Sequence, residues 1–216
     1  MKKTKVILVG EPKVGKTSII NQYVENSFLD EYLTTLTGEK LSKEVEINNS
    51  KINLEIWDTA GQEQFRAVNK VLMKNSKIAI LVYDITDKKS FKELSYWYNQ
   101  IISTNDKDNL IIGIAGNKSD RYEEQVVPFE EGQKYADKIN ATFKETSAMD
   151  HESIDSLFNQ VLEKLVEKEK KQDKIEENKD KDKDIDKDKD KKTNQPFSLD
   201  AKKITEKQDN EGGCGC

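Results

Sequence analysis

The chain has 216 residues and a net charge of −5, and its two cysteines, Cys214 and Cys216, stand at the C-terminal end. This length accommodates one α/β domain and an additional segment, and the acidic balance argues against a general nucleic-acid-binding role by electrostatics. No apolar run approaches the roughly 20 residues that span a bilayer, the N-terminus opens a strand and not a signal peptide, and the body has no disulfide framework, which fits the reducing cytosol.

Strand and helix patterns alternate through residues 1–167, which we expect to form one domain. The expected strands are 4–10, 41–47, 52–58, 78–84, 110–116 and 142–145, and the expected helices are 16–25, 90–103, 129–139 and a last helix with an apolar stripe over 154–165. This alternation predicts an α/β fold with a mostly parallel six-stranded sheet and helices on both faces. The hairpin signal at 48–50 adds one antiparallel edge strand.

Two local expectations accompany this pattern. Ser90 and Glu93 stand at the spacing of a capping box, so we expect Ser90 to begin the helix 90–103. His151 opens the last helix and has no plausible nucleophile beside it, so we expect a solvated residue near the helix cap.

The composition changes after residue 167. Lysine and acidic residues dominate the stretch 179–190, and residues 168–213 contain equal numbers of lysines and acidic residues. Too little apolar surface is present there to offset the entropy of ordering, so we predict a disordered tail over 168–216. Because this tail is neutral, it lacks the polybasic block that binds anionic lipid by charge.

The strand 4–10 leads directly into the pattern G-x-x-x-x-G-K-[ST] at residues 10–17. In a strand–loop–helix context such a loop cradles phosphates with successive backbone N–H groups, while its lysine reaches the β- and γ-phosphates and its hydroxyl binds Mg²⁺. The candidate phosphate-binding residues are Gly10, Val14, Gly15, Lys16, Thr17 and Ser18.

A second motif, Asp-Thr-Ala-Gly-Gln, follows the strand 52–58. Asp58 can hold Mg²⁺ opposite the phosphate loop, directly or through water. Gly61 allows a close approach of its N–H to a γ-phosphate, and Gln62 can orient water for in-line attack. The alternative is an ordinary strand-to-turn segment, which the phosphate loop makes the weaker interpretation.

A third motif, Asn117-Lys118-Ser119-Asp120, follows the fifth expected strand. Asp120 presents two acceptors, which suit the adjacent N–H donors of guanine and not of adenine. The stem of Lys118 can cover the ring, and Thr146-Ser147-Ala148 after the sixth strand can offer a backbone N–H to guanine O6. Each segment alone is more often a polar loop, but their order and placement favour base recognition.

These motifs, in this order over residues 1–167, resemble those of small GTPases. Within that group the chain resembles the Rab family of membrane-traffic regulators, through WDTAGQEQFR at 57–66, LVYDITD at 81–87 and the terminal Cys214-Gly215-Cys216. The Rab resemblance implies geranylgeranylation of Cys214 and Cys216, and two prenyl chains anchor a protein stably where one is marginal. The alternative for these cysteines is an incidental or metal-binding pair.

The resemblance also implies a Ras-like P-loop GTPase domain that binds GTP or GDP with Mg²⁺ and hydrolyses GTP through Gln62 and Lys16. It implies that Thr35 binds Mg²⁺ and meets the γ-phosphate, with Thr34 and Thr37 as competitors, and that Phe28 packs edge-on against guanine or, alternatively, belongs to the core. The implied partners are an exchange factor, an activating protein, a dissociation inhibitor and effectors at switches I and II. The implied location is the cytoplasmic face of an intracellular membrane, in exchange with the cytosol.

The chain departs from the family at several positions. Pro12 stands in the phosphate loop where a small residue is usual, which removes an N–H and fixes φ. Of the apolar triad that Rab effectors commonly read, the positions here are Lys40, Trp57 and Leu72, and only the tryptophan matches, so we expect a private effector set. Two other functions stay open: a GTP-locked module of the same fold, which Pro12 favours, and a nucleotide kinase or ATPase, which Asp120 disfavours.

Overall fold

The computed structural model describes residues 2–28, 39–59 and 70–190. The chain divides into two compact units, Met1–Gln172 and Asp173–Cys216. In the described residues no helix is both long enough and apolar enough to cross a membrane.

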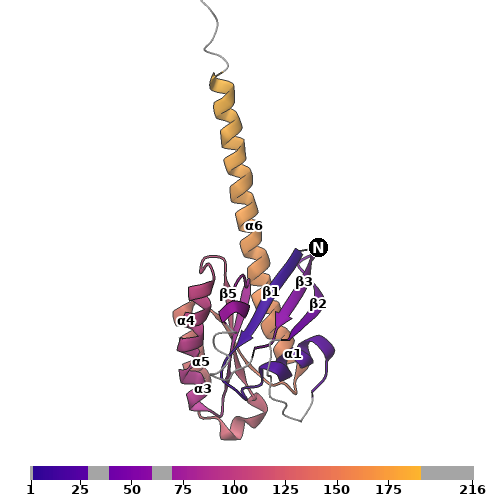
Figure 1. The fold of residues 1–216 in the computed structure, drawn as a ribbon, viewed down its shortest axis with the longest axis vertical. Coiled ribbons are helices and arrows are strands. Elements are labelled where there is room, and N and C mark those ends of the chain that lie inside the picture. The colour runs from indigo at the N-terminus through magenta and orange to yellow at the C-terminus, as the bar shows by residue number, and fades with distance from the viewer. Residues whose placement is uncertain (1, 29–38, 60–69, 191–216) are drawn as a thin grey trace, which may run out of the picture. The chain divides into compact units, whose positions relative to one another are not determined.

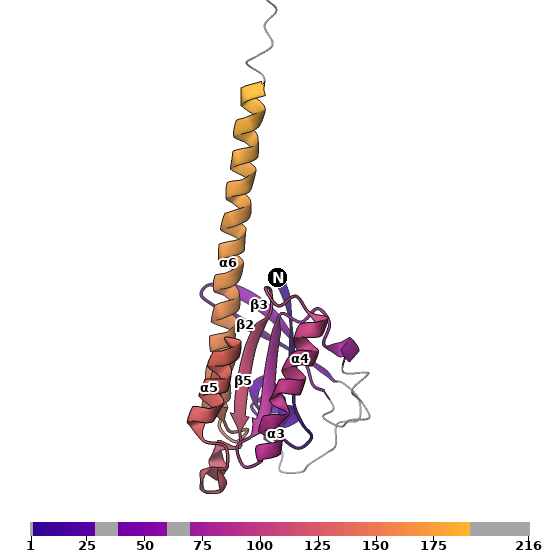
Figure 2. The same cartoon turned by 90° about the vertical axis from the view of Figure 1, so that its left-hand side faces the viewer.

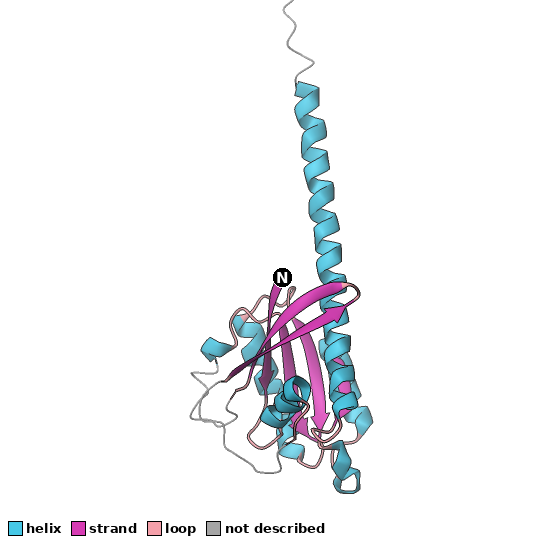
Figure 3. Cartoon of the chain, turned by 90° about the vertical axis from the view of Figure 1, so that its right-hand side faces the viewer, coloured by secondary structure: helices cyan, strands magenta, loops and turns pink. Residues whose placement is uncertain are grey.

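The first unit contains a six-stranded sheet with helices between the strands (Figures 1 and 3). Its strands are β1 (Lys2–Val9), β2 (Lys40–Ile47), β3 (Ser50–Trp57), β4 (Ile78–Asp84), β5 (Ile111–Asn117) and β6 (Thr142–Thr146). Its helices are α1 (Lys16–Glu25), α3 (Lys88–Lys92), α4 (Leu94–Thr104), the 3₁₀ helix η2 (Ser119–Glu124), α5 (Phe129–Ile139) and the first part of α6 (His151–Asp190).

The sheet order is β2-β3-β1-β4-β5-β6, and every pair is parallel except β2–β3. The edge strand β2 turns into β3 through Asn48 and Asn49, which both have positive φ, at 50° and 63°. Asparagine tolerates this conformation, and two such residues match the twist of a tight hairpin. The predicted fold class, including the single antiparallel edge strand, is confirmed.

Two apolar clusters lie on the two faces of the sheet. On one face the strands pack against α1 and the first turns of α6, where Tyr23 stacks on Phe158 with ring centroids 3.7 Å apart. On the other face they pack against α3, α4 and α5, around Trp97, Tyr83 and Ile101. Figure 2 shows the strands between α4 on one side and the first turns of α6 on the other. Because both faces are covered, β4 and β5 are buried along their whole length.

The helix predicted over 90–103 is two helices, and Ser90 does not begin it. The N-cap is Asp87, whose carboxylate accepts from the N–H of Lys89 at 2.9 Å. The Ser90 hydroxyl is buried, where it accepts from the N–H of Asp84 and donates to the carbonyl of Asp87. A carboxylate one turn earlier therefore took the capping position, and the serine instead fastens α3 to the end of β4.

The last helix extends beyond the predicted boundary at residue 167, since α6 runs to Asp190. Residues 168–190 are mostly lysine, aspartate and glutamate. Helical hydrogen bonds join residues four apart, so the backbone of this segment needs no tertiary partner. The tail over 168–216 was predicted from its lack of apolar surface, and hydrogen bonds within a helix do not depend on apolar burial. Residues 191–216, with Cys214 and Cys216, lie outside the described residues.

Candidate functional site

The predicted motifs meet at one edge of the sheet. Because β1, β4, β5 and β6 are parallel, their carboxyl ends lie at the same edge, and the phosphate loop, Asp84, Asn117 and Thr146 each stand at or just past one of these ends. This edge is where ligands bind in open α/β sheets.

The two glycines of the phosphate loop are required by geometry. Gly10 has a φ of 152°, and a Cβ there would lie 2.2 Å from the carbonyl oxygen of Val82 on β4. Gly15 has a φ of 96°, and a Cβ there would lie 2.3 Å from the side-chain nitrogen of Asn117. The loop therefore lies too close to β4 and β5 for any side chain at either position.

Lys16 begins α1 and points back along the loop. Its ammonium donates to the carbonyl oxygens of Gly10 and Glu11, each at 2.9 Å, and the residue is only 6% exposed. Burial lowers the pKa of Lys16 to about 8, and the carboxylates of Asp58 and Glu11 oppose that shift. An ammonium group has three donors, so a third remains for an anion beside the loop.

The side-chain oxygens of Thr17, in the first turn of α1, and Asp58, directly after β3, lie side by side. The Thr17 hydroxyl donates to the Asp58 carboxylate at 2.6 Å, and Asp58 is buried. The next residue, Thr59, donates its hydroxyl to the carbonyl of Leu8 at 2.7 Å, which fixes this segment against β1. A hydroxyl and a carboxylate beside a phosphate loop are the ligand types that suit Mg²⁺.

Asn117 joins the phosphate loop to the segments 117–120 and 146–148, which were predicted to recognise a base. Its amide nitrogen donates to the carbonyl of Val14 at 2.8 Å, and its amide oxygen accepts from the Thr146 hydroxyl at 3.3 Å. Asn117 is buried. Three segments far apart in the sequence are thus tied together by one side chain.

The two base-recognition loops are also joined to each other. The Ser147 hydroxyl donates to the Asp120 carboxylate at 2.5 Å and accepts from the N–H of Met149. The N–H of Ser147 donates to the Ser153 hydroxyl at 3.1 Å. Of the two predicted backbone donors in this loop, the geometry therefore favours Ala148 for a base.

The remaining predicted residues have different outcomes. Ser18 lies in the first turn of α1, and Phe28 is 38% exposed, so it is not a core aromatic. Lys118 has a left-handed backbone, with φ of 67°. The predicted residues Thr35, Gly61, Gln62, Cys214 and Cys216 lie outside the described residues, as do the competitors Thr34 and Thr37.

Three residues that contribute contacts at or near the site were not predicted from the sequence. Asp84 pairs with the Lys118 ammonium at 2.6 Å, and its place at the end of β4 was a signal of the same kind as the others. Glu11 accepts from the indole N–H of Trp97 at 3.2 Å, a contact from α4 that no local pattern indicates. The ring of His151 hydrogen-bonds the carbonyl of Gln22 at 3.0 Å, so this residue links α6 to α1 and is not simply solvated.

Comparison with known protein families identifies the family of this chain. The family model described as the Ras family matches residues 5–167. The chain belongs to the Ras family. Within this family it is similar to Ras-related protein Rab-21 of Homo sapiens, at 39% identity over 163 residues that cover 76% of this chain and 72% of that protein. It is also similar to Ras-related protein RabQ of Dictyostelium discoideum, at 41% identity over 162 residues covering 75% and 79%.

These relatives identify a divergent Rab-type small GTPase, which acts in membrane trafficking. Members of the Ras family generally bind GTP and GDP with Mg²⁺ and hydrolyse GTP. The expectation of a Rab-family member is confirmed, and the alternatives of a GTP-locked module and of a nucleotide kinase or ATPase are not favoured.

The buried Lys16 predicts a pH dependence for nucleotide binding to this Ras-family chain. A bound phosphate favours the charged lysine, so binding above the pKa of the nucleotide-free protein requires proton uptake. Since that pKa is about 8, GDP affinity should be constant at lower pH. Above it, the dissociation constant should rise by up to about tenfold per pH unit.

Titration of fluorescent GDP between about pH 6.5 and pH 9 measures this effect. The matched control is Lys16→Arg, whose guanidinium stays charged throughout. This variant should bind GDP more weakly but with a flat profile. Equal slopes in the two proteins would show that Lys16 is not the titrating group.

Proposed function

We propose that this chain binds GTP or GDP with Mg²⁺ at the carboxyl edge of the sheet and hydrolyses GTP slowly until an activating protein stimulates it. The observation that carries the proposal is the hydrogen bond from Asn117 to Val14. It supports the proposal because it holds the segment suited to phosphates and the segment suited to a base in one fixed relation. A nucleotide contains both phosphates and a base, so one nucleotide can contact both segments at once.

The residues at the phosphate loop fit a magnesium ion. The oxygens of Thr17 and Asp58 belong to the ligand class that Mg²⁺ prefers, and Mg²⁺ in nucleotide sites needs few protein ligands besides phosphates and water. We assign Thr17, Asp58 and, from the family resemblance, Thr35 to the ion. Mg²⁺, when bound, would supply positive charge that neutralises the phosphate oxygens.

The chain's own groups would position the phosphates and the attacking water. The backbone N–H groups of the phosphate loop, from Val14 to Ser18, would donate to phosphate oxygens, as would the third N–H of Lys16. These fixed donors stabilise the charge that develops as the γ-phosphoryl group leaves. Gly61 would add a donor near the γ-phosphate, and Gln62 would orient the water.

We assign guanine selectivity to Asp120. Its carboxylate is already aligned by the Ser147 hydroxyl, and the second oxygen gives guanine a further acceptor. Lys118, whose ammonium is tied to Asp84, would cover one face of the base with its stem, and Phe28 would meet it edge-on. The Ala148 N–H would donate to guanine O6.

Hydrolysis by the isolated chain should be slow, with a single-turnover rate constant on the order of 10⁻⁴ s⁻¹, because this class depends on a positive charge added by an activating protein. Pro12 acts in the same direction by removing one N–H from the loop. Gln62→Leu should lower the rate by about tenfold or more and leave GDP affinity unchanged.

The matched control is Gln64→Leu in the same segment, which should hydrolyse GTP like the parent chain. Phosphate release measured from GTP-loaded protein decides the matter. Complete hydrolysis within seconds by the partner-free chain, or equal rates for the two leucine variants, would contradict the proposed roles.

We propose that two geranylgeranyl groups on Cys214 and Cys216 hold the protein at the cytoplasmic face of an intracellular membrane, with a dissociation inhibitor returning it to the cytosol. Residues 168–213 have no net charge, so electrostatic attraction to anionic lipids would add little to membrane binding. Fractionation of cells should therefore place the intact protein with membranes and Cys214→Ser/Cys216→Ser in the cytosol. Each single serine variant should be intermediate, because one prenyl chain binds only marginally.

If the intact protein and the double variant were equally cytosolic, the membrane anchor would be refuted. Equal membrane binding by both would also refute it, since the association would then need no lipid on these cysteines.

The positions that Rab effectors commonly read, Lys40, Trp57 and Leu72, support a set of effectors specific to this chain. Lys40 is opposite Trp57 in the β2–β3 register, and its side chain is 43% exposed and pairs with Glu55 at 3.6 Å. Leu72 and Trp57 pack partly against the apolar cluster of α3, α4 and α5. An ammonium therefore stands where the family's effectors usually meet an aromatic ring, and we propose that exchange factor, activating protein and effectors are matched to this charge.

A further inference from the structure

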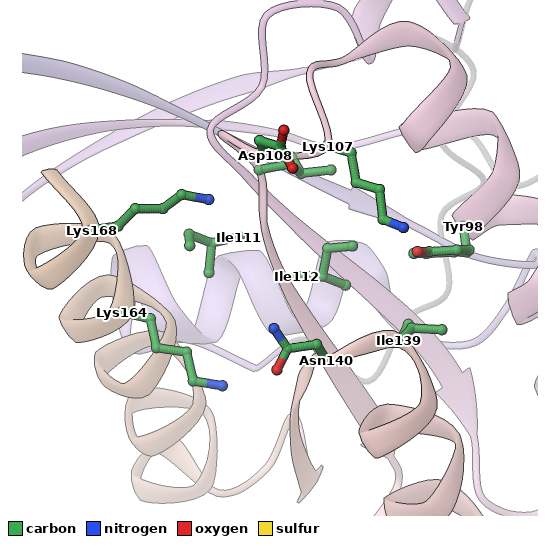
Figure 4. A pocket seen from close by; sticks show the side chains of 10 residues that line it. Tyr98, Lys107, Asp108, Ile111, Ile112, Ile139, Asn140, Lys164 and Lys168 are labelled. Carbon is green, nitrogen blue, oxygen red and sulfur yellow. The ribbon is translucent and has the colours of Figure 1, made fainter. Parts of the chain in front are cut away.

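A concave site lies at the other end of the sheet from the nucleotide motifs. It is a pocket of about 390 Å³ lined by the α4–β5 connection, the first residues of β5, the end of α5 and α6 (Figure 4). Ile111 begins β5 and Asn117 ends it, so the pocket and the base-recognition loop are separated by roughly 20 Å along the strand. A volume of this size accommodates a small ligand.

The floor of the pocket is apolar because the first residues of β5, which are isoleucines, extend beyond the start of the neighbouring strand β6. Pairing between β5 and β6 starts at Gly113 and Thr142, so Ile111 and Ile112 precede the paired part, and no strand in the described part of the chain pairs with them on that side. Each of these isoleucines is 9% exposed. Their side chains point to opposite faces of the sheet, Ile111 toward the cluster of α1 and α6 and Ile112, with Leu110 and Ile139, toward the cluster of α3, α4 and α5, so the apolar floor lies on both sides of the edge of β5.

The walls of the pocket are basic and stand on opposite sides. Lys164 and Lys168 are four residues apart on α6, so they lie on the same face of the helix. Figure 4 shows their ammonium groups directed over the floor from one side, while Lys107 and the Tyr98 hydroxyl approach from the other and the Asn140 amide lies between them. Within the described residues, none of the three lysines forms an ion pair.

One carboxylate, that of Asp108, lines the pocket beside these three ammonium groups. The pocket is therefore positive in a chain whose net charge is −5. Lysine is a compact charge suited to phosphate, and tyrosine and amide donors add directed hydrogen bonds to phosphate oxygens. Because the lysines approach from two sides, the arrangement fits two or more phosphates on one molecule.

We propose that this pocket binds a ring bearing several phosphomonoesters, with the ring against the edge of β5 between Ile111 and Ile112 and its phosphates on the lysine walls. A soluble inositol phosphate and the headgroup of a phosphorylated inositol lipid share this chemistry. The pocket uses none of the groups assigned to GTP, so its occupancy does not depend on the nucleotide site.

The experiment uses the full chain saturated with GDP and Mg²⁺, so that the phosphate loop is not available to the probe. Inositol 1,4,5-trisphosphate is titrated by calorimetry and by methyl NMR of the isoleucines. The same protein is sedimented with phosphatidylcholine vesicles that contain or lack phosphatidylinositol 4,5-bisphosphate, and inorganic phosphate is tested as a competitor.

Saturable binding with shifts at Ile111 and Ile112 is expected. Lys107→Gln/Lys164→Gln/Lys168→Gln should weaken it by at least about 30-fold, and Asp108→Asn should strengthen it by about threefold. The control Lys51→Gln/Lys89→Gln/Lys134→Gln removes the same charge from exposed positions outside the pocket and should bind like the parent chain.

Recruitment to the phosphoinositide vesicles, lost in the pocket variant, would identify a lipid headgroup as the source. Binding of the soluble compound without vesicle recruitment would identify a free inositol phosphate. The proposal is overturned if no saturable binding is found, if inorganic phosphate alone competes at equal concentration, or if the pocket and control variants bind equally.

Discussion

Replacing Asp120 with alanine is expected to weaken GDP binding by about 10²- to 10³-fold and to leave the weak binding of ADP unchanged. The reason is the loss of an anionic acceptor for two adjacent guanine donors, since a hydrogen bond to a charged group contributes about 1.5–3 kcal/mol and each 1.4 kcal/mol is tenfold in affinity. The carboxylate is held in place by Ser147, so the effect should not be recovered by a neighbouring side chain.

Two further variants distinguish the direct contact of Asp120 with guanine from two other effects. These are the loss of a nearby negative charge and the loss of the hydrogen bond that aligns the carboxylate. Glu123→Ala removes an exposed carboxylate three residues along in η2 and should leave GDP affinity unchanged. Ser147→Ala keeps the carboxylate but loses its alignment, so a smaller loss of about three- to tenfold is expected. Fluorescent GDP and ADP titrations measure all of these, and an equal loss in Asp120→Ala and Glu123→Ala would rule out direct recognition.

The second large effect is expected for Gly15→Ala. The new methyl would lie 2.3 Å from the Asn117 amide, at a backbone φ of 96° that disfavours any side chain. The Asn117–Val14 bond must then break, which separates the phosphate loop from the base-recognition loop. Backbone strain and a lost buried hydrogen bond together predict GDP binding weaker by about 10²- to 10³-fold.

The matched control is Gly113→Ala on β5, whose Cβ would meet Val161 at 3.0 Å in the core and not at the nucleotide edge. It should lower the melting temperature and leave GDP affinity unchanged. The loss of GDP-binding free energy in the double variant Gly15→Ala/Asn117→Ala should be smaller than the sum of the losses in the two single variants. The reason is that each single change already removes the Asn117–Val14 hydrogen bond. Strict additivity would show that the two residues act independently.

Much of this fold follows from local patterns in the sequence. The bounds of α1, β4 and α5 agree with the prediction because each segment has an apolar period of its own and a clear end, such as Asn140 after α5. The prediction at Ser90 was wrong because two residues with capping chemistry stood within one turn, and burial of Ser90 decided between them. Caps are therefore less predictable than the helices they begin.

The place of the candidate site residues in the fold was easier to predict from the sequence than the contacts between them. Parallel strands bring their carboxyl ends together, so motifs at strand ends had to meet. The contacts of Glu11 with Trp97 and of His151 with Gln22 depend on how helices pack, which no spacing encodes. The pocket over Ile111 arises from a difference in where two neighbouring strands start, and that register becomes visible only in the folded sheet.

Selective binding of a guanine nucleotide with Mg²⁺ is the central claim, and a direct comparison of the dissociation constants for GDP and ADP tests it. With the full chain and Mg²⁺ present, GDP should bind at least about 10⁴-fold more tightly than ADP, because a site built to pair with a base rejects one that lacks the donors. Comparable affinities for GDP and ADP would contradict the account.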